Sequence, residues 1–480
     1  MYIGIIRNIF FDKTGREINM DKEKVYSAIY NKYIMPTKAV RKNYIGVEIE
    51  MPVVALNGSC VDEKTVHEIA DFFSDRFGFA PSGYDSQGEV TSFENNESGD
   101  ILSFDCSYSN LELSFGRAKT LFDVYDRFKS YYSFLNDRFH VQGYILTGMG
   151  INPNSANIHG KPIQNERYRM LYHYLHSYKK HTSEFGISFH DRPDFGTFTS
   201  ASQVQLDVSY DRLIDVINVT GLLEPYKAML FANSYMPEHP EFLCVRNMLW
   251  EHSMQGYNPH NVGMFSLPIH SVNELIEYIG TQSIYCTMRN GKYIDFKPIR
   301  VCDYFDRNEI HGEYFNGEKY CEITFKPEQS DINYLRTFKF QDLTFRGTIE
   351  YRSSCCQPIS DVMTVAAFHT GINERISELK ELLKDDRVIY SHGYSPTELA
   401  EMFSKREYPD FVEKSELSKQ LIRILKLAED GLIYRANGEE KLLAPLFERA
   451  ERLTNPAREM VTGIENGISM WDFIEKYSRV

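Results

Sequence analysis

The pattern of apolar and polar positions predicts a chain that alternates between strands and helices. Residues 44–54 are almost continuously apolar, which is typical of a buried strand, whereas residues 61–77 carry apolar side chains at helical spacing. Residues 89–115 alternate in short strand-like segments, and a long amphipathic helix is expected over residues 120–139. Further helices are expected at residues 21–33, 167–177 and 211–233, and further strands at residues 141–146, 202–208, 320–325 and 344–351.

The chain changes character after about residue 370, where segments at helical spacing become rich in Leu, Glu and Lys. These segments are expected to form either a small bundle or a cover on the sheet that the earlier strands build. The strands have one polar face, which is typical of an antiparallel sheet with one open side, so the pattern predicts an α+β protein. The expected C-terminal helices are residues 372–383, 396–404, 415–430, 440–453 and 470–477.

Two glutamates interrupt the apolar strand at residues 44–54. Glu48 and Glu50 are two residues apart, so both side chains would point to the same face of the strand, while Val47 and Ile49 face a core. Two like charges so close together are unfavourable unless a cation neutralises them. Carboxylate oxygens suit Mg²⁺, so the pair predicts a magnesium site and phosphate chemistry. The alternative is an exposed edge strand with two solvated glutamates, which the flanking apolar residues disfavour.

Polar side chains on two other strands are candidates for the same open face. Glu112 lies between two leucines, and on its own this pattern is commonly just the solvent face of a strand. Gln203, Gln205 and Asp207 alternate along one strand, which ordinary solvent exposure explains equally well. Both observations gain weight if these strands pair with the acidic strand.

Three arginines are candidates for binding an anion. The planar guanidinium group of Arg167, Arg246 or Arg352 can hold a carboxylate or phosphate through two parallel hydrogen bonds. Each alone is more often part of a surface ion pair, so the assignment depends on whether they converge. His173 and His176 share a helix without a third metal ligand and are expected to be structural or surface residues. No Walker A, GxSxG or dinucleotide-binding sequence occurs, so any phosphate site is built differently.

The composition narrows the class of protein. The 480 residues are 42% hydrophobic and 25% charged, as is usual for a globular protein, and the net charge of −14 argues against non-specific binding to nucleic acid or anionic membranes. No apolar run approaches the roughly 20 residues of a membrane-spanning helix. Residues 1–7 lack the features of a signal peptide, and eight cysteines occur without CxxC pairs, so we expect a reduced, cytoplasmic protein.

Short sequence motifs in a fixed order carry a resemblance to a known family. The run Phe231-Ala232-Asn233-Ser234 matches a Phe-Ala-Asn-Ser run of that family, and residues 242–250 resemble its Phe-Leu-Ser-Met-Arg-Ser-His-Ile-Trp. The other similar segments are residues 46–50, 111–114, 166–170, 202–207 and 349–352. Together these segments, over residues 44–370, resemble the glutamate–cysteine ligases of the plant and proteobacterial type, which are glutamine-synthetase-like carboxylate–amine ligases.

Two segments depart from the family pattern. Residues 104–110 replace a Leu-Glu-Pro-Gly-Gly-Gln segment, so that the family's glutamate falls at Cys106, beside Asp105. The family's Arg-Gly-Ala-Asp reads Arg352-Ser353-Ser354-Cys355 here. The resemblance is therefore to a divergent member, in which one metal or substrate contact differs.

The resemblance implies a ligase that uses ATP and Mg²⁺ to join the γ-carboxylate of L-glutamate to the amine of L-cysteine through a γ-glutamyl phosphate, as in glutathione biosynthesis. It also implies a curved antiparallel sheet that forms an open funnel with helices outside. The catalytic domain would be residues 1–370, followed by a helical region at residues 371–480. The implied metal ligands are Glu48, Glu50 and Glu112, the implied substrate- and nucleotide-binding residues are Arg167, Gln203, Gln205, Arg246, Trp250 and Arg352, and Arg246 and Arg352 are also the implied catalytic residues.

The partners implied are small molecules, L-glutamate and an amino acid or amine acceptor, and a homodimer is among the expected assemblies. Three alternatives to the cysteine ligase remain open. The altered segments at residues 104–110 and 352–356 favour a ligase that uses another amine. A guanidine or amine phosphotransferase of the same superfold would release ADP without free phosphate. The missing glutamate at Cys106 motivates a catalytically inactive nucleotide-binding relative.

Overall fold

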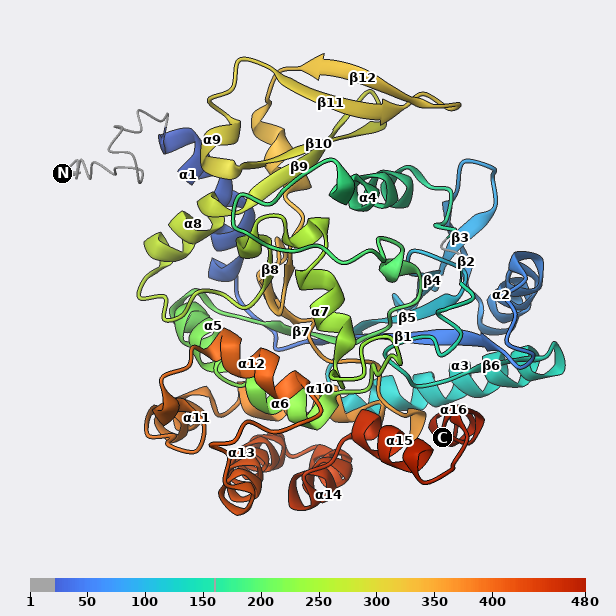
Figure 1. Ribbon diagram of the computed structural model, residues 1–480, viewed down its shortest axis with the longest axis vertical. Coiled ribbons are helices and arrows are strands. Elements are labelled where there is room, and N and C mark those ends of the chain that lie inside the picture. The colour runs from blue at the N-terminus through green and yellow to red at the C-terminus, as the bar shows by residue number, and fades with distance from the viewer. Residues whose placement is uncertain (1–21, 159–160) are drawn as a thin grey trace.

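The computed structural model describes residues 22–158 and 161–480, whose strands form three sheets (Figure 1). The largest has nine strands in the order β14-β15-β7-β1-β5-β4-β3-β2, with β6 paired to the end of β1. All of its strand pairs are antiparallel. Its strands are β1 (Ile45–Ala55), β2 (Ala80–Tyr84), β3 (Val90–Glu94), β4 (Ile101–Phe104), β5 (Asn110–Ala118), β6 (Tyr144–Leu146), β7 (Ser202–Asp207), β14 (Gln341–Leu343) and β15 (Thr348–Tyr351).

There are two smaller sheets, and the four-stranded one lies on the side of the molecule away from the C-terminal helices (Figure 1). A four-stranded antiparallel sheet has the order β12-β11-β10-β9, and a parallel pair joins β8 to β13. Their strands are β8 (Val262–Gly263), β9 (Ser283–Arg289), β10 (Lys292–Arg300), β11 (Ile310–Phe315), β12 (Tyr320–Phe325) and β13 (Phe338–Lys339).

The helices surround the large sheet. The longest that packs directly on it is α3 (Leu121–Val141), which begins where the Thr120 side chain accepts a hydrogen bond from the Asp123 amide. Asp62 caps α2 in the same way, so this helix starts two residues later than the apolar spacing predicts. The other helices are α1 (Lys22–Ile29), α2 (Glu63–Phe77), α4 (Glu166–His176), α5 (Leu213–Gly221), α6 (Glu224–Phe231), α7 (Val245–Glu251), α8 (Val272–Thr281), α9 (Val301–Tyr304) and α10 (Thr364–Asn373).

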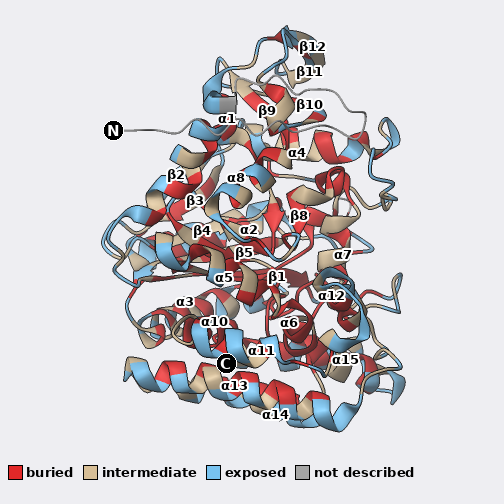
Figure 2. Cartoon of the chain, turned by 90° about the vertical axis from the view of Figure 1, so that its left-hand side faces the viewer, coloured by how far each residue is buried: buried red, intermediate tan, exposed pale blue. Residues whose placement is uncertain are grey.

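Of the C-terminal helices, α13 and α14 lie below α6 and α10, where they expose one side to solvent (Figure 2), and α12 packs beside α6. Helices α10 and α13 cross closely because Gly371 and Gly431 face each other, and a Cβ atom on Gly431 would lie 2.0 Å from the Gly371 carbonyl oxygen. The C-terminal helices therefore cover one side of the rest of the fold. They are α11 (Ile376–Lys384), α12 (Pro396–Ser404), α13 (Lys414–Arg435), α14 (Ala444–Arg452), α15 (Pro456–Glu465) and α16 (Met470–Tyr477).

Most predicted elements are confirmed, and the errors have local causes. The helix expected over residues 211–233 is two helices, because Pro225 lies in the first turn of α6. The strand expected at residues 141–146 is confirmed only over its second half, since α3 continues to Val141. The strand expected at residues 344–351 likewise begins only at Thr348, after a turn.

The expected C-terminal helices also differ in detail from the observed ones. The helix expected at residues 372–383 spans a break between α10 and α11, and the one at residues 440–453 begins as a 3₁₀ turn before α14. Helix α15 was not predicted. Residues 1–7 and Asp21, on which the signal-peptide expectation and the start of the first helix rest, lie outside the described residues. None of the described helices is both long and apolar enough to cross a membrane.

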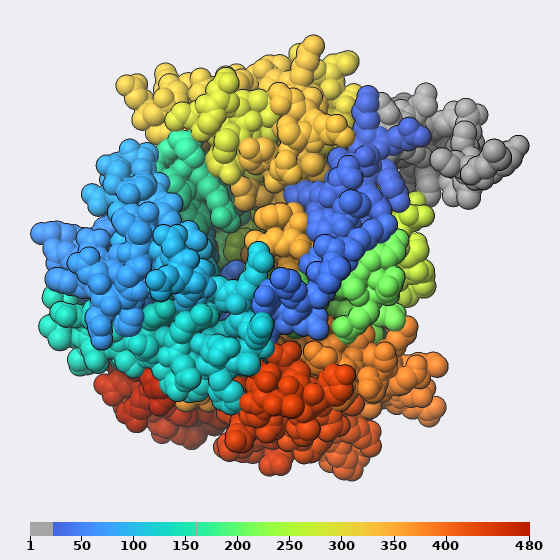
Figure 3. All heavy atoms as spheres, turned by 180° about the vertical axis from the view of Figure 1, so that it is seen from behind, coloured from blue at the N-terminus to red at the C-terminus, as the bar shows by residue number. Residues whose placement is uncertain are grey.

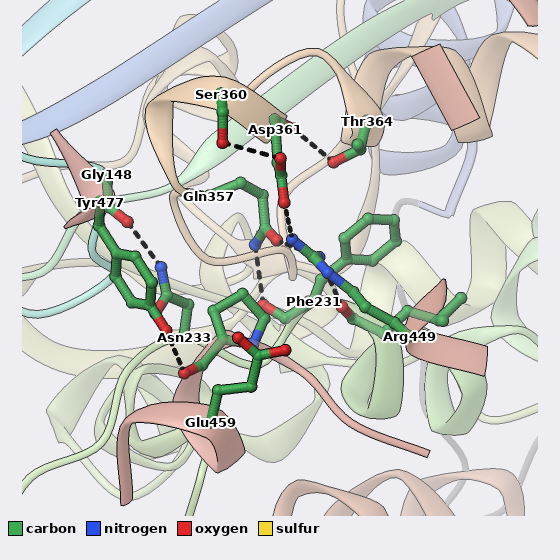
Figure 4. A network of polar contacts seen from close by, with 12 residues as sticks. Gly148, Phe231, Asn233, Gln357, Ser360, Asp361, Thr364, Arg449, Glu459 and Tyr477 are labelled. Atoms are coloured by element: carbon green, nitrogen blue, oxygen red, sulfur yellow. Dashed lines mark hydrogen bonds and ion pairs between the residues drawn. The ribbon is translucent and has the colours of Figure 1, made fainter. Parts of the chain in front are cut away.

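A buried polar network ties the C-terminal helices to the segment that follows β15 (Figure 4). Arg449 of α14 donates from Nη1 to Gln357 Oε1 at 2.7 Å and from Nη2 to Asp361 Oδ2 at 2.7 Å. Gln357 Nε2 in turn donates to the Phe231 carbonyl oxygen at 3.0 Å. The network therefore holds the chain just beyond Arg352 against α6.

We expect Arg449→Met to lower the free energy of unfolding by about 3 kcal/mol, because it leaves the buried acceptors of this network without their donor. Chemical denaturation followed by circular dichroism measures this change. Arg452→Met is the matched control, since Arg452 is exposed on the same helix and is expected to change stability by less than about 0.5 kcal/mol. Equal effects of both substitutions would contradict a stabilising role for the network.

Candidate active site

A row of carboxyl groups lies on one face of the nine-stranded sheet. Glu50 of β1 is directly opposite Glu112 of β5, and Glu48 is opposite Gln203 of β7. Side chains two residues apart share a face, so the alternation along β1 puts Val47 into the core and the two glutamates on the other face, as the sequence predicts. On β14 and β15 the same face carries Asp342 and Glu350, which are paired with each other, and Glu350 is also opposite Gln205. Asp105, just after β4, completes a carboxylate cluster of Glu48, Glu50, Asp105, Glu112, Asp342 and Glu350.

Amide groups on β7 and just before it hold the two central glutamates. Gln203 Nε2 donates to Glu50 Oε1 at 2.6 Å, and the backbone amide of Ala201 donates to Glu50 Oε2 at 2.7 Å. Gln205 Nε2 donates to Glu48 Oε1 at 2.9 Å. Because β7 pairs with β1, the alternating glutamines of β7 donate hydrogen bonds that orient the glutamate carboxylates of β1.

Burial and mutual repulsion disfavour the ionised form of the carboxyl groups in this cluster. Burial raises the pKa of Glu50 to about 8, and the neighbouring charge of Asp105 adds to the shift. Burial also raises the pKa of Glu112 to about 7, again with Asp105 contributing. The pKa of Glu48 lies well above its usual range because of burial and the charge of Glu350. Perturbed carboxyl groups of this kind, gathered in one place, are typical of a functional site.

The predicted arginines take different positions. Arg352 lies on the carboxylate face, where its Nη1 is 3.2 Å from Glu350 Oε1, and its buried Nε has no hydrogen-bond partner. Arg246 is 2% exposed and donates from Nη1 to the main-chain oxygen of Arg352 at 2.9 Å. Both guanidinium groups lie 5.2 Å from the centre of the Phe338 ring. Arg246 is therefore placed to position Arg352.

A cavity of about 1030 Å³ opens over one end of the carboxylate cluster. Arg167, Trp250, Glu350 and Arg352 line it, and the Trp250 ring stacks on Phe338 with 4.2 Å between ring centres. Figure 3 shows the hollowed face between the segment around α4 and the segment around residues 330–350. The volume suits a nucleotide or a pair of small substrates.

Another hollow, of about 840 Å³, adjoins the other end of the cluster and is lined by Glu48 and Gln205. Arg346 lines both hollows and donates from Nη2 to Gln205 Oε1 at 2.7 Å. Basic groups flank this 840 Å³ hollow, among them Arg41 and Arg117. The carboxylate cluster thus borders both hollows.

Sequence reasoning missed several residues of this face. Glu350 could have been found, because its two-residue spacing from Arg352 repeats the pattern of Glu48 and Glu50. Asp342 and Arg346 gave no comparable signal, since only the pairing of β14 with β15 brings them to the site. The predicted surface or structural role of His173 is consistent with its place outside the cluster, where its ring lies 2.9 Å from Asp295.

The altered segment at residues 104–110 places an acid at the cluster in an unexpected way. Cys106 has a φ of 58°, a left-handed conformation, and is buried. Burial raises the pKa of the Cys106 thiol well above its usual range, so the thiol stays neutral. Asp105 accepts a hydrogen bond from the Tyr168 hydroxyl at 3.0 Å, and its charge acts on Glu50 and Glu112. The carboxylate at this turn therefore comes from Asp105.

The residues present suit a hard cation. In residues 22–158 and 161–480 no three His, Cys, Asp or Glu side chains are already grouped as tightly as metal ligands. The donor set nevertheless fits, because Glu48, Glu50 and Glu112 offer carboxylate oxygens and the buried Gln203 Oε1 has no hydrogen-bond partner. The role of the three glutamates as magnesium ligands stays a prediction.

Comparison with solved structures identifies the fold. A glutamate–cysteine ligase from Francisella tularensis, in complex with AMP, matches this chain with a TM-score of 0.50 over 92% of this chain and 89% of that one, at 11% sequence identity. The chain has the fold of a glutamate–cysteine ligase. The resemblance predicted from short motifs is confirmed at this level, as is the α+β class with an antiparallel sheet, flanking helices and a helical C-terminal region.

Two other solved structures match less closely. A bifunctional glutathione synthetase from Pasteurella multocida has a TM-score of 0.44 at 12% identity, over 95% of this chain and 53% of that one. A complex of GmaS with ADP has a TM-score of 0.31 at 10% identity, over 93% of this chain and 76% of that one. Searches of protein-family models and of curated proteins each find no match.

The raised carboxyl pKa values predict how stability depends on pH. Glu50 binds its proton up to about pH 8 in the folded protein but only up to its ordinary value of 4.5 when unfolded, so the folded state binds more protons between these limits. Stability of the ligand-free protein should therefore fall as pH rises from 5 to 8, by up to about 1.4 kcal/mol per pH unit for this group. Denaturant unfolding of wild type and Glu50→Gln at several pH values measures the difference, and parallel curves would contradict it.

Proposed function

We propose that this protein is an ATP- and Mg²⁺-dependent ligase that joins the γ-carboxylate of L-glutamate to the amine of L-cysteine through a γ-glutamyl phosphate. The observation that carries the proposal is the cluster of buried carboxyl groups beside Arg352 at the wall of a nucleotide-sized cavity. The fold shared with a glutamate–cysteine ligase supports it. Catalytic domain and helical region are proposed as residues 1–370 and 371–480.

Glu48, Glu50 and Glu112 would hold the magnesium ions, with Gln203 and Gln205 fixing the carboxylates in place. When bound, the metal supplies charge neutralisation to the phosphates of the nucleotide. Asp105 would take the part of the glutamate that Cys106 replaces, since its charge already acts on both Glu50 and Glu112. A bound metal ion would offset the repulsion between these carboxyl groups, so the glutamates would ionise.

Arg352 would bind the anionic reactant, because its side chain lines the cavity beside the carboxylate cluster and a guanidinium group can hold a carboxylate or phosphate. Arg167 lines the same cavity from α4 and is placed to meet a second negative group. Trp250 and Phe338 form an aromatic wall against which a planar group can stack. The main task of these residues is to hold two anions and an amine in reacting position, which lowers the entropic part of the barrier.

A ligase that uses another amine is the second candidate. The turn at Cys106 and the sequence after Arg352 both differ from the family pattern, and both border the site. A different acceptor would keep the same acyl-phosphate chemistry and the same carboxylate cluster. A purely inactive nucleotide-binding protein is less well supported, because a fold without catalytic demand gains nothing from so many unneutralised buried acids.

The test is release of ADP and phosphate from Mg-ATP and L-glutamate, with L-cysteine and a panel of other amino acids and amines. Cysteine-dependent release with γ-glutamylcysteine as product supports the first proposal. Release only with another amine supports the second candidate, and ADP without free phosphate would point to a phosphotransferase. If no acceptor gives turnover, calorimetry with Mg-ATP separates an inactive nucleotide-binding protein from one that binds no nucleotide.

A further inference from the structure

A second, separate cavity of about 360 Å³ lies against helix α7, away from the carboxylate cluster. Trp250 of α7 lines the active-site cavity, whereas Asn247, Met248 and Glu251 of the same helix line this second one. Among the described residues, none lines both cavities. The second cavity is therefore distinct from the space in which the proposed reaction occurs.

Two other helices give whole faces to this second cavity, where α6 and α12 pack together (Figure 1). Residues at spacings of three, four and seven lie on one side of a helix, and both helices follow this rule here. From α6 these residues are Glu224, Lys227, Ala228 and Phe231, and from α12 they are Thr397, Ala400, Glu401 and Ser404. The cavity is therefore lined by one continuous face of each helix.

Glu251 is the acid in this wall that has no cationic partner in contact. Glu224 forms a 2.6 Å ion pair with Lys227, and Glu401 forms a 2.8 Å ion pair with Lys405. No hydrogen bond or ion pair to another described residue reaches the Glu251 carboxylate. Its Oε1 rests against the backbone of Gly263, where a Cβ atom would lie 2.3 Å away.

The charge of Lys339 acts on this carboxylate but does not satisfy it. The ammonium group of Lys339 donates to the main-chain oxygen of Val262 at 2.7 Å, to that of Met264 and to the Tyr278 hydroxyl at 3.1 Å. Its three donors are therefore in use. Burial raises the pKa of Glu251 to about 7, which reflects the missing partner. The Ser353 hydroxyl, in a residue only 4% exposed, also lines the cavity and makes no hydrogen bond.

We propose that this cavity is a second ligand site, which binds a small molecule with a protonated amine on an apolar body. The ammonium group would meet Glu251, and the Ser353 hydroxyl offers a further acceptor. The apolar body would lie against Phe231, Phe242 and Phe340. The volume is at the small end of known ligand cavities. This site stands independently of the proposed ligase activity, because it shares no lining residue with the active-site cavity.

The experiment compares 2-phenylethylamine with 2-phenylethanol by titration calorimetry, without nucleotide, on the full chain. The two probes have the same shape and differ in the ammonium group, so wild type should bind the amine about tenfold or more tightly. Glu251→Gln should bind both probes equally. Ala400→Leu, which fills the cavity from α12, should weaken the binding of both.

Glu48→Gln is the control in the carboxylate cluster, and it should leave the binding of 2-phenylethylamine unchanged. Equal affinity of wild type for the two probes, or no binding of the amine, would overturn the proposal. An amine preference that survives in Glu251→Gln, or undiminished binding of the amine in Ala400→Leu, would overturn it as well, because the probe would then bind elsewhere. Since no ATP is present, failure here is separate from failure of the ligase assay.

Discussion

Glu50→Gln is expected to reduce turnover by about a thousandfold and at the same time to raise the temperature of unfolding. The carboxylate is 3% exposed and central to the proposed metal site, and a metal ion contributes several kcal/mol to stabilising a phosphoryl-transfer transition state. The amide has nearly the same shape but does not ionise, so it removes the cost of burying the carboxyl group and its repulsion by Asp105 and Glu112. Opposite changes in activity and stability are the signature of a site kept for function.

Steady-state release of phosphate and thermal unfolding by circular dichroism measure the two effects. Glu94→Gln is the matched control, since Glu94 is on β3 of the same sheet but outside the carboxylate cluster, and both measurements should stay near wild type. Adding Mg-ATP should raise the unfolding temperature of wild type more than that of Glu50→Gln. Full activity of Glu50→Gln would remove the metal assignment, and a lower unfolding temperature would mean that the carboxylate stabilises the fold.

The sequence predicts the centre of the site well because strand alternation is a local property. The two-residue spacing of Glu48 and Glu50 within an apolar run determines which face each side chain takes, whatever the partner strands are. The same reasoning applies to Glu112 and to Gln203 on their own strands. The pairing of β5 and β7 with β1 then brings the predicted residues together.

The rest of the site depends on contacts that are distant in sequence. Asp342 joins the carboxylate cluster only because β14 pairs with β15 at the edge of the sheet, and no local pattern marks it. The turn that brings Asp105 to the cluster requires Cys106 to adopt a left-handed backbone conformation, which residues other than glycine rarely adopt. The sequence also does not predict the cavity at α7, because it forms only when α6, α7 and α12 pack together around Glu251.

The two arginines illustrate the limit of assignment from residue type. Both Arg246 and Arg352 are predicted as catalytic residues, yet only Arg352 lines the cavity, whereas Arg246 donates to the Arg352 main-chain oxygen. A guanidinium group can bind a substrate or hold the backbone of its neighbour, and the sequence alone does not distinguish these uses.

This difference leads to the second large expected effect. Arg352→Lys should lower kcat/KM for glutamate by two to three orders of magnitude, on the order of 3–4 kcal/mol, because an ammonium group cannot replace the planar fork beside Glu350. Arg246→Lys should cost only about tenfold, since it loosens one hydrogen bond to the Arg352 backbone. The ordering of the two variants follows from their geometry.

Separate measurement of kcat and KM shows what Arg352 binds. A higher KM with unchanged kcat indicates a ground-state carboxylate, whereas an equal fall in kcat and kcat/KM indicates a group that forms only in the transition state. Added guanidinium should restore part of the activity of Arg352→Ala but none of that of Glu50→Gln, because only the first variant leaves a hole of that shape and charge. Wild-type kinetics for Arg352→Lys would make Arg352 structural, and a larger loss in Arg246→Lys would exchange the roles of the two residues.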